Sequence, residues 1–276
     1  MAASAVLAGS YEPHQDILNA ERTLLQALQM SDRLRDTGPD SMPLTVETYT
    51  KFWNTAKEKT STYPDALSFS TMKASSKNSA IAEVECMLTR IPLKAGCSPS
   101  HWKNWMDVML LKRSVVSHLG SLCTVVLFSA DCNYAFKHIG HQMMKRAEAA
   151  KALAKEQYGS RKSHKATDLA TNKTLTYDIL RQLKQPGVVC SNDAKSCYDL
   201  IGHTQASLAM RTMGVPKSAV DCIFMTLQEA NHRVHTGYRD FTASYGGNKE
   251  NTPMHGICQG NRGRTGNLGR PELPFT

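Results

Sequence analysis

Helical and strand-like hydrophobic patterns follow one another irregularly along the chain, and this order of segments constrains the fold more than any other feature. Apolar residues at helical spacing predict most of the secondary structure, whereas short β-branched runs bounded by turn residues predict a few strands. The expected helices cover residues 14–36, 45–59, 78–90, 133–157, 164–184, 203–213 and 216–231, with one more starting near Ser70 and another, capped by Ser100, carrying Trp102 and Trp105. The expected strands cover residues 122–128, 187–192, 232–238 and 241–245, the last two as a hairpin. This irregular mixture favours an α+β fold over a regular βαβ series.

The composition is that of a globular chain that buries a core. Of the 276 residues, 41% are hydrophobic and 21% are charged, which excludes a disordered protein. The longest apolar run, at residues 123–128, is far shorter than the ~20 residues that a membrane helix needs. The N-terminal segment lacks a basic region and is too short for a secretory signal. We therefore expect an intracellular protein of the nucleus or cytoplasm, without a membrane partner.

Eight cysteines are spread along the chain without a Cys-x-x-Cys pair, so the spacing of a zinc module is missing from the sequence. Without a secretory signal, these cysteines are expected to be reduced and mostly buried thiols. His232 and His235 have the spacing of two metal ligands on one helical turn. Their segment has the pattern of a strand and offers no third ligand nearby, which disfavours a zinc site.

The net charge of +9 is concentrated in one part of the chain. Residues 143–187, the basic block, contain ten Lys and Arg against four Asp and Glu, an excess of six positive charges. Such a block suits a polyanionic partner, because Lys and Arg contact phosphate groups and release counterions. The alternative is a solvated helix face, which is the commoner meaning of a charge run considered alone.

The segment at 187–199 contains the clearest candidate for a reactive site. A short apolar stretch at 187–189 leads to Asp193, and Tyr198 and Asp199 follow. A carboxylate at the end of a buried strand can hold a divalent metal, because the sheet fixes it while the loop leaves room for a substrate. Considered alone, Asp193 is more readily explained as a strand-end residue that caps the next turn. The segment lacks the Asp-x-Asp of a haloacid-dehalogenase-like phosphatase, which disfavours that class.

Several motifs in the second half of the chain resemble those of reverse transcriptases, in particular of the non-LTR retrotransposon type. The string NDAKSCYD at 192–199 is similar to polymerase motif A, in which an Asp is followed five residues later by an aromatic residue and six residues later by a second Asp. The string GICQG at 256–260 resembles motif B. Residues 122–137 and 157–162 resemble two preceding segments of the fingers, and the similarity extends back to about residue 60.

The resemblance implies the fingers and partial palm of a right-hand polymerase. Residues 1–59 would form a helical N-terminal region, 60–186 a fingers-like region with basic helices, and 187–261 a partial palm with motifs A and B. The implied activity is RNA-templated DNA synthesis by two-metal nucleotidyl transfer, with an RNA template, a DNA primer and deoxynucleotides as partners. The implied cofactor is Mg²⁺ or Mn²⁺, which takes oxygen ligands and leaves positions open for phosphate and water.

The resemblance also assigns roles to single residues. Asp193 is implied to be the catalytic carboxylate and a metal ligand, with the Ala194 carbonyl as a second ligand. Tyr198 would lie under the incoming sugar and exclude a 2′-hydroxyl, while Asp199 is implied to be structural. The remaining implied contacts are Gln259 and Gly260 to nucleotide and template, and Arg161, Lys162 and Lys165 to phosphates. Two positions depart from the family pattern: Cys123 stands where an Arg is common, and Ser160 stands where an aromatic residue is usual.

The family's motif C, an aromatic-x-Asp-Asp hairpin with the remaining catalytic carboxylates, has no counterpart in this sequence. No Asp-Asp pair occurs, and the last Asp is Asp240. Residues 262–269, RGRTGNLG, can be written in codons that read GAGPAIWA in a shifted frame, which resembles the residues after motif B in related sequences. We therefore expect 262–276 to be a non-native tail after a single-nucleotide frameshift, with an aromatic-x-Asp-Asp motif in another frame of the coding DNA. Catalysis by the chain as it stands is expected to be negligible.

Two alternatives stay open. One is a non-catalytic nucleic-acid-binding remnant of a retroelement, which uses the basic block. The other is a product that folds poorly, because a palm sheet without its motif-C hairpin would expose a strand edge.

Overall fold

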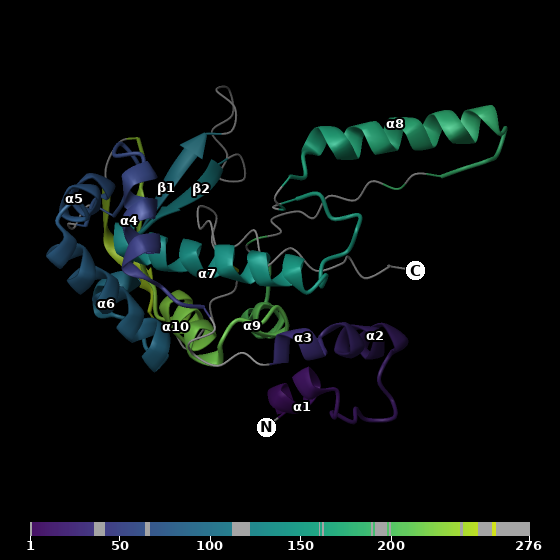
Figure 1. The fold of residues 1–276 in the computed structure, drawn as a ribbon, viewed down its shortest axis with the longest axis horizontal. Helices are drawn as coiled ribbons and strands as arrows, with labels where there is room; N and C mark the ends of the chain where they lie inside the picture. Colours follow the sequence, from purple (N-terminus) through teal and green to yellow (C-terminus); the bar gives the residue numbers. More distant parts are fainter. Residues whose placement is uncertain are drawn as a thin grey trace.

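The structure, a computed structural model, is an assembly of helices around one small sheet (Figure 1), which confirms the α+β class. It describes residues 2–35, 42–63, 67–111, 122–159, 161, 163–188, 190, 198, 200–237, 240–247 and 256–257. The helices are α1 (Ala2–Ala8), α2 (Asn19–Ala27), α3 (Asp32–Arg35), α4 (Val46–Thr55), α5 (Phe69–Ser75), α6 (Ser79–Ala95), α7 (Ala130–Ala149), α8 (Ala166–Gln182), α9 (His203–Thr212) and α10 (Lys217–Gln228), with a 3-10 turn, η2 (Ser100–Lys103). The strands are β1 (Asn104–Leu111), β2 (Leu122–Leu127), β3 (Asn231–His235) and β4 (Asp240–Gly246). Among the described helices, none has the length and apolar character to cross a membrane.

The sheet has the order β2-β1-β3-β4. β1 runs antiparallel to β2 and parallel to β3, and β4 completes the sheet as the antiparallel partner of β3. β1 and β2 come from the predicted fingers-like region, whereas β3 and β4 come from the predicted palm. One sheet therefore joins segments that are far apart in the sequence, and one hydrophobic core, built from α4–α7, α9, α10 and the first two strands, packs with it.

Most predicted helices and the predicted hairpin are confirmed, with ends set by local capping. The Thr45 hydroxyl accepts a hydrogen bond from the Thr48 N–H at 3.2 Å, and Asn78 Oδ1 accepts from the N–H groups that open α6. α6 runs beyond the predicted end at 90 and contains Pro92. It ends at Gly96, whose φ of +71° is easily adopted only by glycine.

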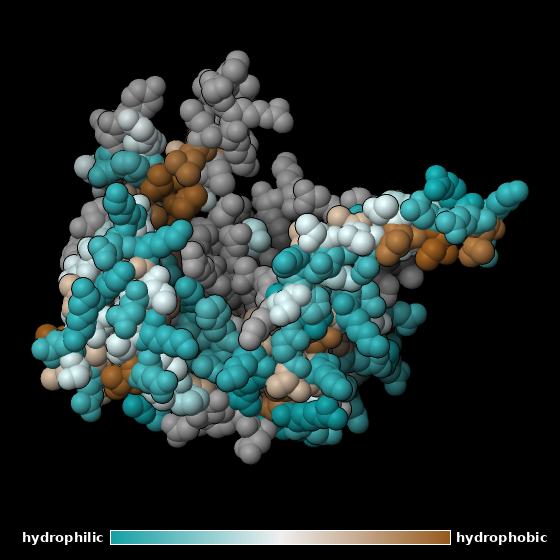
Figure 2. Space-filling view, turned by 45° about the horizontal axis from the view of Figure 1, so that its top comes forward, coloured by the Kyte–Doolittle hydropathy of each residue, from teal (hydrophilic) through white to brown (hydrophobic). Residues whose placement is uncertain are grey.

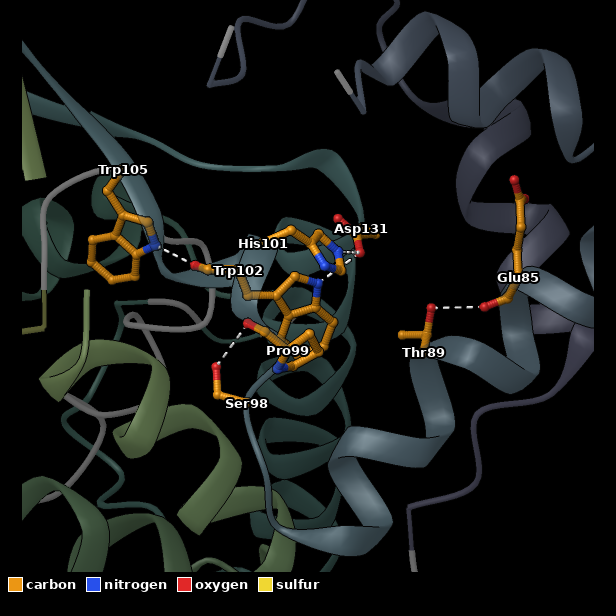
Figure 3. Close-up of polar contacts among 8 residues, drawn as sticks. All are labelled: Glu85, Thr89, Ser98, Pro99, His101, Trp102, Trp105 and Asp131. Atoms are coloured by element: carbon orange, nitrogen blue, oxygen red, sulfur yellow. Dashed lines mark hydrogen bonds and ion pairs between the residues drawn. The ribbon is translucent and has the colours of Figure 1, made fainter. Parts of the chain in front are cut away.

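The predicted helix after Ser100 is wrong beyond its first turn. Trp102 lies in η2, whereas Trp105 already belongs to β1 and pairs with His232 of β3. The indole N–H of Trp105 donates to the Trp102 carbonyl at 2.6 Å, and that of Trp102 donates to Asp131 Oδ2 at 2.6 Å (Figure 3). Two buried tryptophans three residues apart fit one face of a helix, but long-range pairing with two strands determines the structure of this segment.

Two other predicted elements also differ. The helix expected over 14–36 is interrupted after Ala27 and resumes only as the short α3. In the strand expected over 187–192, the described residues 187, 188 and 190 are not in a strand, and Val188 is 91% exposed. A Cβ on Gly187 would lie 2.7 Å from Leu180 Cδ1, so the chain here passes close against α8 rather than entering the sheet.

Helix α8 stands apart from the rest of the molecule. It projects from the body in Figure 1, and Figure 2 shows apolar surface on this projecting arm. Every residue of α8 is described, and none of them is buried. The exposed apolar side chains on and just beyond it are Leu169, Leu175, Tyr177, Ile179 and Leu183.

Candidate functional site

The start of the string that resembles motif B is hydrogen-bonded to the end of the string that resembles motif A and to a residue just after it. The N–H of Ile257 donates to the Tyr198 carbonyl at 2.9 Å, and the N–H of Gly256 donates to the Ile201 carbonyl at 2.9 Å. Tyr198 belongs to the motif A string, and Gly256 is the first residue of the motif B string. These two hydrogen bonds therefore form a motif A–B bridge between segments that are distant in the sequence.

His203 adds a third link to this bridge. Its Nε2 lies 2.7 Å from the Gly256 carbonyl oxygen, and since a carbonyl only accepts hydrogen bonds, Nε2 carries the proton. His203 is the buried first residue of α9, and its ring centroid lies 5.4 Å from that of Phe224. Gly256 has a φ of +90°, a backbone conformation that a side chain would disfavour. The bridge thus depends on a glycine at this first position of motif B.

Apolar side chains fix the bridge to the body of the protein. Ile257 is 1% exposed and belongs to the hydrophobic core. Tyr198 and Ile201 are half-buried and pack against the same core. The Tyr198 position is therefore held from both its backbone and its side chain, as a residue that shapes a binding site would need to be.

Five of the predicted site residues lie outside the described residues: Lys162, Asp193, Ala194, Gln259 and Gly260. Their roles stay predictions. The donor chemistry of Asp193 and Ala194, a carboxylate and a carbonyl oxygen, suits Mg²⁺ or Mn²⁺. Across the part of the chain that the structure describes, no group of three or more His, Cys, Asp or Glu side chains could hold a metal ion.

The two histidines with metal-ligand spacing face different partners. They lie on β3, where residues three apart point to opposite faces of the sheet. His232 Nδ1 lies 3.0 Å from Asp107 Oδ2, whereas His235 Nδ1 bonds to Asp240 Oδ1. The geometry agrees with the strand pattern that disfavoured zinc.

A buried polar network around Asp107 is the feature that the sequence analysis missed. Asp107 lies on β1 with 1% exposure and accepts hydrogen bonds from His232 of β3 and from the Tyr245 hydroxyl of β4. The His232 ring lies between Trp105 and Tyr245, with centroid distances of 5.1 and 4.9 Å. A buried carboxylate is tolerated only when it is hydrogen-bonded, so the network fixes the register of three strands. The lone Asp in the apolar run of 105–111 is the signal that could have revealed it.

All three guanidinium nitrogens of Arg161 donate hydrogen bonds to other residues of the chain. Its Nε and Nη2 donate to the two carboxylate oxygens of Glu148 at 2.7 and 3.0 Å, and its Nη1 donates to the carbonyls of Ala154 and Gln157. This bidentate pair lowers the pKa of Glu148 and raises that of Arg161. These bonds tie the loop after α7 back to α7, and the phosphate contact of Arg161 stays a prediction.

Lys165 lies at the start of α8 with an exposed side chain. Its backbone N–H donates to Asp168 Oδ2 at 2.8 Å and so caps the first turn of the helix. Among the described residues of the basic block, seven cations have exposed side chains: Lys145, Lys151, Lys155, Lys165, Lys173, Arg181 and Lys184. They extend from the second half of α7 to the end of α8.

A second buried carboxylate, Asp131 at the start of α7, serves the fold. Burial alone would raise the pKa of Asp131, but the hydrogen bonds from His101 and Trp102 outweigh it and lower the pKa. His101 Nε2 lies 2.7 Å from Asp131 Oδ2 (Figure 3). The cluster fastens η2 to α7.

No protein-family model matches the sequence, and a comparison with curated proteins gives no match. The family resemblance is therefore carried by the sequence motifs, and the functional argument by the geometry of the motif A–B bridge.

Proposed function

We propose that the chain carries the fingers and partial palm of a reverse transcriptase of the non-LTR retrotransposon type, whose activity is RNA-templated DNA synthesis. The observation that supports this proposal is the motif A–B bridge. Motifs A and B are both expected to line the nucleotide site, and a nucleotide site requires them to be neighbours. The hydrogen bonds from Ile257 to Tyr198 and from Gly256 to Ile201 meet that requirement.

In this proposal each motif residue has a defined contact. Asp193 and the Ala194 carbonyl would hold Mg²⁺ or Mn²⁺, which would supply activation of the primer hydroxyl and stabilisation of the leaving pyrophosphate. Tyr198 excludes the 2′-hydroxyl of a ribonucleotide. Gln259 and Gly260 contact the nucleotide and the template, and Arg161, Lys162 and Lys165 contact phosphates.

The test uses photocrosslinking of a deoxynucleotide to the 276-residue polypeptide in the presence of Mn²⁺ and a labelled RNA template–DNA primer. We expect labelling near motifs A and B, competed better by deoxynucleotides than by ribonucleotides. Asp193→Asn should reduce labelling about tenfold or more, because a metal ligand is lost, whereas the matched Asp199→Asn should change it little. Tyr198→Ala should weaken the preference for the deoxy sugar. Equal labelling of the wild type and Asp193→Asn would contradict the proposal.

Primer extension on the same complex is a separate readout. The polypeptide contains no Asp-Asp pair, so we expect no extension from these 276 residues even where the nucleotide binds. Extension that is lost in Asp193→Asn would show that the site needs no further carboxylates.

The exposed cations of the basic block favour a second candidate, a non-catalytic nucleic-acid-binding remnant. In that case primer–template affinity would fall steeply with salt and would not respond to Asp193→Asn, and no deoxynucleotide would crosslink. Replacing Lys165 and Lys173 by Glu should weaken binding. It should also reduce the slope of the logarithm of affinity against the logarithm of salt concentration by about one for each lost phosphate contact. Replacing Lys57 and Lys59, exposed lysines outside the block, by Glu is the matched control.

A further inference from the structure

Helix α6 has apolar side chains on the face that points away from the core. Its inner face is buried through Ala82, Cys86, Thr89 and Leu93, among others. Its outer face holds a row of large apolar residues that are 45–61% exposed: Ile81, Val84, Met87, Leu88 and Ile91. A surface helix normally places polar residues there, and a contiguous apolar row marks an interaction site. We call these five residues the α6 stripe.

The spacing of the α6 stripe is that of a helix–helix seam. Ile81, Val84, Leu88 and Ile91 follow one another at intervals of three, four and three residues. This alternation keeps apolar residues on one line along a helix and is typical of two helices that pack side by side. Met87, Arg90, Ile91, Lys94 and Ala95 line an open groove beside the seam, which offers space for the side chains of a second helix.

The charges beside the stripe indicate what the second helix is. Glu83, Met87, Arg90 and Lys94 form one row along the flank of the stripe, with the acid at its N-terminal end and the two bases at its C-terminal end. An antiparallel copy of the same helix would place its own bases opposite Glu83 and its own acid opposite Lys94. A parallel two-fold pair would instead place this row opposite the other flank of the partner helix, so the row could not pair with itself.

The register of the charges agrees with that of the apolar residues. A two-fold axis at Leu88 brings Val84 to within one residue, about 1.5 Å along the helix, of the level of Ile91 in the other copy. The same axis brings Glu83 to within one residue of the level of Lys94. One self-complementary arrangement therefore satisfies both sets of side chains, as a two-fold interface requires.

We propose that two copies of this chain associate through an antiparallel pairing of their α6 stripes. Figure 1 shows α6 on the outer edge of the body, on the side away from α8, so the pairing leaves the basic block accessible. A stripe of five side chains is at the small end of specific interfaces, and we expect a dissociation constant on the order of micromolar. The proposal does not depend on the polymerase assignment.

Sedimentation velocity of the purified chain, in reducing buffer and from about 1 to 100 µM, measures the association. The expected result is a monomer–dimer equilibrium. Leu88→Glu should weaken it at least about tenfold, because it places two carboxylates near the axis. The matched control Leu175→Glu, at an exposed leucine of α8, should leave it unchanged. Leu88 is 61% exposed, so at protein concentrations where the chain is monomeric the unfolding midpoint should be the same in both variants.

A charge exchange tests the antiparallel register. Glu83→Lys and Lys94→Glu should each weaken the dimer several-fold, because each places like charges opposite one another, and the double variant should restore it. Three results would overturn the proposal: a monomer at every concentration, a dimer that is insensitive to Leu88→Glu, or a double variant no stronger than the single ones. A monomer would leave the α6 stripe to a different partner.

Discussion

Helices α7 and α8 follow each other in the chain, both contribute to the basic block, and both were predicted from the same kind of periodicity, yet only one of them is part of the core. α7 has eleven buried residues, including Phe136, Ile139 and Met143. α8 has no buried residue, and five large apolar side chains in the helix or just after its end are exposed. The difference shows that an amphipathic pattern specifies a helix but not what covers its apolar face.

The way the helices end does not explain this difference, because their C-terminal ends are built alike. Two residues after α7, Lys151 has a φ of +55°, and the Ala152 N–H donates to the Ala147 carbonyl at 2.9 Å. Two residues after α8, Lys184 has a φ of +51°, and the Gln185 N–H donates to the Leu180 carbonyl at 3.0 Å. Both are the same C-terminal capping motif. Burial against the core therefore distinguishes the two helices.

The same substitution in the two helices should give the largest contrast. Ile139 in α7 is 2% exposed, whereas Ile179 in α8 is 54% exposed. Ile139→Ala leaves a cavity and should lower the free energy of unfolding by about 2–5 kcal/mol. Ile179→Ala should change it by no more than about 0.5 kcal/mol, because no cavity forms. Urea unfolding followed by tryptophan fluorescence measures both, and similar losses would show that α8 unfolds together with the core.

Acid should lower the free energy of unfolding through His138, which is buried in α7. Burial, with a smaller effect from the charge of His141, lowers the pKa of His138 from 6.5 to about 4. Between these two pH values the unfolded chain binds more protons than the folded one. The contribution of neutral His138 to the free energy of unfolding is therefore fully present above pH 6.5 and is lost as the pH falls towards 4. At 1.36 kcal/mol for each pH unit, the loss reaches about 3 kcal/mol.

The variant His138→Gln should flatten this part of the pH profile, because the titrating group is gone. His164→Gln, at a half-buried histidine close to α8, should leave the slope in place. Urea midpoints at pH 7 and at pH 4.5 are the measurement. A slope that persists in His138→Gln would assign the acid sensitivity to other groups.

The sequence predicted the elements whose signals are local. β2, the β3–β4 hairpin and most helices follow from periodicity and capping within a few residues, as at Thr45 and Asn78. β1 could not be predicted in this way, because pairing with two distant strands and the Asp107–His232 hydrogen bond decide its structure. The α6 stripe could not be predicted either, since both faces of that helix are apolar and the pattern does not say which is buried.

In the candidate site, too, the local features could be predicted from the sequence and the long-range contacts could not. The motifs that contain Tyr198 and Gly256 could be found in the sequence, because a resemblance is a property of short strings. Their contact could not be derived from spacing, because it depends on the packing of Ile257 in the core and on His203 of α9. The structure added the geometry that joins the two motifs, whereas the predicted ligands Asp193 and Gln259 lie outside the described residues.

The smallest effect comes from the shared helix ends and tests the comparison most closely. A non-glycine residue at positive φ costs about 1–2 kcal/mol. Glycine removes this cost, but its greater freedom in the unfolded chain cancels part of the gain in stability. Lys151→Gly should therefore raise the free energy of unfolding by about 0.5–1 kcal/mol, because α7 unfolds with the core. Lys184→Gly relieves the same conformation but should leave the global midpoint unchanged, since α8 buries nothing in the core. Urea unfolding and amide exchange along α8 measure the two effects, and equal shifts in the global midpoint would mean that the projecting helix and the core form one cooperative unit.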